Sequence, residues 1–139
     1  MSNASDFSNQ TLKWLAYAQS DLRAAKALLK TNKDLTNQVC YHSQQAAEKA
    51  IKAGLIFLRI DFPFVHDLDE LRDRLPKEWK CVQDYPDLDT LTGWAVNGRY
   101  PDSAEDPSEA EASRSIQQAS GILISIKQDL EERGLSLEE

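Results

Sequence analysis

The sequence has few of the residues that form covalent or metal-held sites. Its 139 residues include two cysteines and two histidines. Cys40 and Cys81 lie far apart and form no CxxC motif, so neither a disulfide nor a zinc site is expected in a chain with no secretion signal. No ExxH pair is present, which argues against a di-iron site. We therefore expect reduced thiols, no metal and no cofactor.

Glycine-rich loops, long apolar runs and a targeting segment are also missing. Five glycines are scattered along the chain, so there is no glycine-rich phosphate loop, and there is no nucleophile elbow. No apolar run approaches the roughly 20 residues that cross a bilayer. The first residues, MSNASDFSNQ, have neither the basic nor the apolar region of a signal peptide. We expect a cytoplasmic protein without membrane contact.

The chain lacks an excess of positive charge. Its net charge is −7 and its pI is about 4.8, which argues against broad, phosphate-driven contact with nucleic acid. No stretch combines basic and aromatic residues as platforms for single-stranded nucleic acid do. Any contact with a nucleotide or RNA is therefore expected to be local.

The most informative stretch that is present runs from Val39 to Leu58, VCYHSQQAAEKAIKAGLIFL. Its small and large apolar residues fill a broad arc at helical periodicity, which predicts a central helix packed on more than one side. The other arc holds four polar side chains that share one face: His42, Gln45, Lys49 and Lys52. The sequence leaves open whether this polar stripe faces solvent, a second subunit or a loop of the same chain.

Helical periodicity extends over most of the chain, and no stretch alternates with period two. We expect long helices over residues 9–30, 35–60, about 84–98 and 108–133, and a short helix over about 66–75. Ser8 or Asn9, Asp34, and Asp67 or His66 are the expected N-caps, and Gly134 is the expected C-terminal stop. The predicted fold class is all-α: an antiparallel up-and-down bundle of four main helices plus one short helix.

A single domain is expected over residues 7–134, because 15.7 kDa suits one core. Residues 1–6 are interpreted as disordered or a tag remnant, and residues 135–139 as a tail. Four aromatic residues gather late in the chain, at Trp79, Tyr85, Trp94 and Tyr100, and Trp79 is expected to tuck onto the bundle. Aromatic side chains left on a surface often mark an interface, which supports a dimer.

Four pieces of the sequence share the order and separations of a known family. They are WLAYAQSDLRAAKALL from Trp14, YHSQQAAEKAIK from Tyr41, HDL from His66 with Leu71 after it, and RYP from Arg99. Over about residues 12–133 the chain resembles the HEPN domain family. That resemblance implies a helical bundle, a homodimer and, in prokaryotes, a minimal nucleotidyltransferase as partner. Family members are described as nucleotide-binding proteins, as RNases of toxin–antitoxin and defence systems, or as non-catalytic relatives.

The RNase members of that family carry an arginine followed, after four to six residues, by a histidine. Arg99 has no histidine after it, because His66 is the last one in the chain. Arg59 and His66 have six residues between them, but Pro63 breaks the helix in that interval. The pair also falls earlier in the chain than the RNase motif of the family.

Two hypotheses follow from these residues. In the first, a dimeric, non-enzymatic module of a toxin–antitoxin or defence system pairs with a nucleotidyltransferase and holds a nucleotide or phosphate. Its pocket residues are His42, Gln45, Lys49, Arg99 and Tyr100, with cations for phosphate and the tyrosine for a base. The alternative is a metal-independent endoribonuclease toxin, with His66 as general base and Arg59 as the cation for the phosphorane charge. His42 is a second titrating candidate, close to Lys49.

Overall fold

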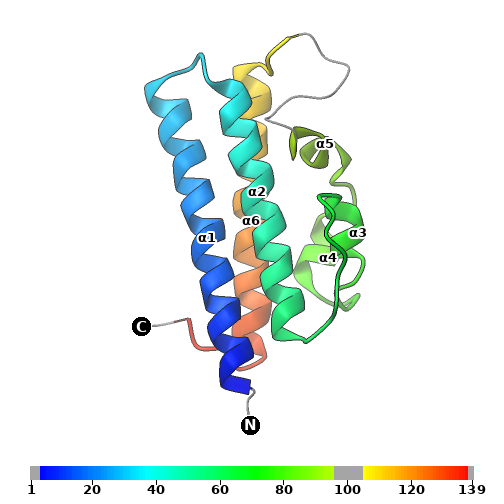
Figure 1. Cartoon of the computed structure of the whole chain (residues 1–139). Coiled ribbons are helices and arrows are strands. Elements are labelled where there is room, and N and C mark those ends of the chain that lie inside the picture. The colour runs from blue at the N-terminus through cyan, green and yellow to red at the C-terminus, as the bar shows by residue number, and fades with distance from the viewer. Residues whose placement is uncertain (1–3, 96–104, 138–139) are drawn as a thin grey trace.

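Three long helices lie side by side in the computed structural model, which describes residues 4–95 and 105–137. They are α1 (Ala4–Thr31), α2 (Thr36–Phe57) and α6 (Glu109–Glu132). Figure 1 shows that α1 runs in one direction and that α2 and α6 run in the opposite direction. Between α2 and α6 the chain returns along α2 through short helices: α3 (Leu68–Arg72), α4 (Lys80–Asp84), α5 (Asp89–Thr92) and a 3₁₀ turn, η1 (Gly93–Ala95). The described residues contain no strand, so the predicted all-α fold class is confirmed. The bundle has three long helices among the described residues, and short helices stand where a fourth main helix was expected.

Helix α2 is the central helix, as predicted. It contacts α1, α6 and the short helices α3 and α5. Its small residues are fully buried, at Ala46, Ala47, Ala50, Ala53 and Gly54. A methyl group added at Gly54 would lie 3.0 Å from Cζ3 of Trp79, so the missing side chain is what allows this indole to pack on α2.

Local capping chemistry explains several helix ends. Ser108 and Glu111 form a capping box at the start of α6, and Gly134 ends that helix with a φ of 97°. Asp67 caps α3 by accepting a hydrogen bond from the backbone N–H of Glu70. The prediction that Asp34 caps α2 is wrong, because Leu35 holds the N-cap position and makes no side-chain cap bond.

Two expected boundaries differ from those observed. Helix α1 begins at Ala4. Residues 4–6, which were expected to be disordered or a tag remnant, are therefore helical. The predicted helix over residues 84–98 is divided in the described part of the chain. Tyr85 ends α4, Pro86 follows it, and the apolar residues beyond form α5 and η1. A proline has no backbone N–H to donate and disfavours a helical conformation in the residue before it. Pro86 therefore separates α4 from α5.

The aromatic residues used above as support for a dimer are mostly core residues. Trp79 is fully buried, as expected, and Trp94 is buried as well. Tyr85 is partly buried against the core, and Tyr100 lies outside the described residues. The two buried tryptophans therefore give no support to a surface interface, and the dimer stays a prediction. Within the described chain, no helix has the length and apolar character needed to cross a membrane.

Candidate functional site: a polar band on helix α2

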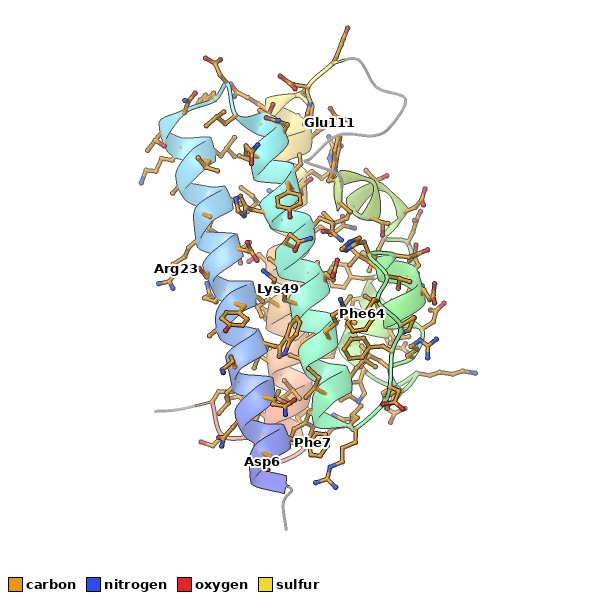
Figure 2. The ribbon with its side chains drawn as sticks, in the orientation of Figure 1. Asp6, Phe7, Arg23, Lys49, Phe64 and Glu111 are labelled. Atoms are coloured by element: carbon orange, nitrogen blue, oxygen red, sulfur yellow. The ribbon has the colours of Figure 1, made fainter. Side chains whose placement is uncertain are left out.

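A band of polar side chains runs along α2 where this helix meets α1 and the loop of residues 58–67. We call it the polar band; its members on α2 are His42, Gln44, Gln45, Glu48, Lys49 and Lys52. Figure 2 shows Lys49 at the seam between α1 and α2. The predicted stripe is thus real, and it faces α1 and a loop of the same chain.

At one end of the band, two basic side chains converge on a single carboxylate from α1. Oδ1 of Asp21 lies 2.9 Å from Nδ1 of His42, and Oδ2 accepts a hydrogen bond of 2.6 Å from Nζ of Lys49. The histidine and lysine side chains are 28% and 27% exposed, so the cluster reaches the surface. With Nδ1 held by Asp21, Nε2 of His42 has no hydrogen-bond partner within the described part of the chain, and Lys49 has two further N–H donors. The arrangement can therefore offer hydrogen bonds to an anion.

At the other end of the band, a buried carboxylate joins α2 to the following loop. Glu48 is 5% exposed. Its carboxylate accepts hydrogen bonds from Nζ of Lys52 at 2.8 Å and from Nε2 of Gln44 at 3.0 Å. The same carboxylate lies 2.8 Å from Nδ1 of His66. Gln44 also donates to the backbone carbonyl of His66, and Gln45 donates to Oε1 of Gln44. Burial acts to raise the pKa of Glu48, but the hydrogen bonds from Lys52, His66 and Gln44 outweigh it, and the pKa lies below its ordinary value.

Lys52 has a different role from the one its position in the stripe suggests. It is 7% exposed, and its Nζ lies 6.0 Å from the ring centre of Trp14 and 5.5 Å from that of Phe62. With Glu48 as its counterion, this ammonium is enclosed by protein groups. Lys52 thus ties the loop to α2, and the surface-accessible basic groups of the stripe are His42 and Lys49.

One chain does not bring Arg59 and His66 together. His66 contacts Glu48, whereas the guanidinium of Arg59 lies 4.5 Å from the ring centre of Phe7, near the start of α1. Glu48 precedes Phe57, the last residue of α2, by nine residues, or about 14 Å along the helix axis, and Arg59 lies two residues beyond that end. A nuclease centre made of this pair would need one of the two residues from a second chain.

Arg99 and Tyr100 lie outside the described residues, so their part in the site stays a prediction. Asp21, Gln44 and Glu48 were not among the site residues predicted from the sequence. Asp21 reads as an ordinary solvated helix residue because its partners are 21 and 28 positions away. A signal for Glu48 was present in the spacing, because Gln44, Glu48 and Lys52 recur at four-residue intervals.

The lowered pKa of Glu48 predicts a specific loss of stability in acid. A carboxyl group whose pKa is lowered by folding stabilises the protein above its unfolded-state pKa, here near 4.5, and loses that contribution as the pH falls through the folded-state pKa. We expect the difference in unfolding free energy between the wild type and Glu48→Gln to shrink between about pH 5 and pH 3. Urea unfolding at several pH values measures it; a difference independent of pH would contradict this assignment.

Three comparisons with known proteins agree with this architecture. The family model described as "HEPN domain" matches residues 11–129. The protein named "Putative toxin MJ1304" from Methanocaldococcus jannaschii is 32% identical over 131 residues, covering 84% of this chain and 85% of that protein. The crystal structure of ST0689, described as an archaeal HEPN homologue, shares the fold with a TM-score of 0.59 and 24% identity, covering 93% of this chain and 98% of that one. The chain belongs to the HEPN domain family.

Proposed function

We propose that this protein is a toxin-type HEPN module that binds a nucleotide or phosphate without cleaving RNA. The observation that supports the proposal is the convergence of His42 and Lys49 on Asp21 at the surface of the α1–α2 seam. The carboxylate fixes both basic side chains in place, so their remaining donors are pre-organised for an anion. Pre-organisation matters because ordering long side chains costs affinity.

Charge-assisted hydrogen bonds are the physical basis of this phosphate site. Lys49 Nζ and, when protonated, His42 can each donate to a phosphate oxygen, and such bonds are roughly twice as strong as neutral ones. Gln45 lies between the two on the same face of α2 and adds a polar, half-buried neighbour. Because the net charge is −7, the protein as a whole does not attract anions. An anion site in this chain is therefore expected to be a small, local cluster of basic groups.

The cellular setting of the module is also part of the proposal. A relative that is named a toxin supports placing this chain in a toxin–antitoxin or defence-type system. In such a system we propose that it acts as a homodimer with a minimal nucleotidyltransferase as its partner.

Titration with AMP and with inorganic phosphate tests the phosphate site. Lys49→Gln removes the charge but keeps most of the side chain's length, and it should weaken AMP binding about tenfold, the loss of one charge-assisted bond. Isothermal titration calorimetry measures the affinity. Lys33→Gln is the matched control, because Lys33 is also ion-paired, with Glu109, but is exposed and lies outside the polar band. Equal affinities for wild type and Lys49→Gln would refute the site.

One observation favours the alternative function, a metal-independent RNase. Glu48 holds Nδ1 of His66 while the side chain of His66 stays 64% exposed, an arrangement that suits a general base. The RNase alternative is weakened by the distance between His66 and Arg59 within one chain. An RNase centre made of these two residues requires the arginine of a second chain. Under this alternative, His66→Ala abolishes RNA cleavage and leaves the thermal melt nearly unchanged.

A further inference from the structure

A cavity of about 420 Å³ opens between the start of α1, the end of α2 and the loop that follows α2. Its walls are largely aromatic, from Phe7, Trp14, Phe62 and Phe64, and two basic side chains, Lys52 and Arg59, border it. Figure 2 shows Phe7 near the start of α1 and Phe64 on the loop side of α2. The volume falls in the range of small-ligand sites, which are typically apolar with a few polar groups.

Arg59 is held at the cavity by an unusual backbone conformation. Helix α2 ends in a Schellman motif, with hydrogen bonds from Arg59 N–H to the Ile56 carbonyl and from Ile60 N–H to the Leu55 carbonyl. Arg59 therefore occupies the left-handed position, with a φ of 61°. Helix α6 ends in the same motif, but there the left-handed residue is Gly134. Glycine is the favoured residue at this position, so the arginine is retained at a conformational cost.

Phe64 is the second unusual residue of the cavity. Its exposed fraction is 101%, which is the largest among the large apolar side chains in the described part of the chain. It lines the cavity without being covered by the rest of the protein. A fully solvated phenylalanine beside an aromatic cavity is suited to close on a flat apolar group that enters from solvent.

Aromatic planes and a nearby arginine together favour one class of ligand. Every nucleobase has a flat face that can stack on an aromatic side chain, so stacking does not depend on which base is bound. Arginine pairs with phosphate oxygens. Gln10 and Asp61 also line the cavity and supply polar groups for the edge of a base. Lys52, at the cavity, and Lys49, in the polar band, are three residues apart, or about 4.5 Å along α2.

We propose that this cavity binds the base of a nucleotide, with Phe64 stacking on the ring and Arg59 contacting a phosphate. This inference rests on the proposed function, to which it adds a cavity for the base and a second set of residues. It also explains how a chain whose sequence shows no basic-aromatic platform can still offer one: α1, α2 and a loop each contribute part of it.

Titrations with AMP, adenosine and inorganic phosphate test the cavity. Phe64→Ala removes a side chain that supports no packing, and Arg59→Gly suits the left-handed backbone, so both variants should fold. We expect AMP affinity to fall at least tenfold in each variant. Adenosine affinity should fall in Phe64→Ala only. Ile124→Ala, at another exposed apolar residue, and Arg23→Gln, at an exposed arginine, are the matched controls.

The variants separate this inference from the proposed function. If Lys49→Gln weakens AMP and phosphate binding while both cavity variants bind like the wild type, the cavity inference is overturned and the phosphate site stands. If only the cavity variants lose affinity, the cavity is supported and the Lys49 site fails. Absence of AMP binding by the wild type overturns both. A change of oligomeric state in Phe64→Ala, measured by light scattering, with unchanged AMP affinity would identify this face as a protein interface and overturn the inference.

Discussion

Replacing Glu48 with alanine is expected to lower the free energy of unfolding by about 3–5 kcal/mol, the range for breaking a buried ion pair by removing one partner. The change leaves the ammonium of Lys52, which is 7% exposed, without its carboxylate. It also removes one of the two acceptors of Gln44 and the partner of the His66 side chain, so the loop loses one of its attachments to α2. Urea unfolding followed by circular dichroism at neutral pH measures the effect.

A double variant separates the buried charge from the packing. In Glu48→Leu with Lys52→Met, both charges are replaced by apolar side chains, and such exchanges are often neutral or stabilising. We therefore expect the double variant to be several kcal/mol more stable than Glu48→Ala. A loss below about 1 kcal/mol in Glu48→Ala, the level of a surface ion pair, would show that the pair is solvated.

Trp79→Ala is the second substitution with a large expected effect, a loss of about 3–5 kcal/mol. Trp79 is fully buried, packs against Gly54, and has the guanidinium of Arg133 at 4.7 Å from its ring centre. Alanine would leave a cavity between α2, α6 and the start of α4. The midpoint of urea unfolding, compared at constant m-value, measures the loss.

Trp79→Phe is the matched control for that prediction. The indole Nε1 is buried and has no hydrogen-bond partner among the described residues, so phenylalanine sacrifices ring volume but no polar contact. We expect Trp79→Phe to cost clearly less than Trp79→Ala. Equal losses would indicate that the indole makes a specific contact, through Nε1 or the larger ring, that phenylalanine cannot replace.

Local sequence signals were sufficient to predict the three long helices α1, α2 and α6, although they also predicted a longer helix over residues 84–98 than the structure contains. The alanine-rich arc identified α2 as the central helix, and Ser108 and Gly134 marked the ends of α6, because caps depend on residues within one turn. The same local reasoning failed at Asp34. Its backbone N–H bonds to the side chain of Asn32, so the polar residues between α1 and α2 satisfy one another within the turn and do not cap α2.

The site was only half predictable, because its pairings are not local. Periodicity placed His42 and Lys49 on one face, but it contains no information on which residue of α1 lies opposite, and Asp21 was overlooked. The same periodicity put Lys52 among the accessible cations, whereas the loop after α2 covers it. Tertiary packing decides both outcomes, and helical periodicity reports only the side of the helix.

The central claim, binding without cleavage, is tested most directly by mixing a labelled single-stranded RNA with nuclease-free wild-type protein and measuring binding and RNA length in the same sample. His66→Ala and Lys49→Gln serve as the two comparison variants. We predict that the RNA stays intact with every variant and that Lys49→Gln binds it more weakly. Cleavage by the wild type that disappears in His66→Ala would contradict the claim and identify an RNase centred on His66.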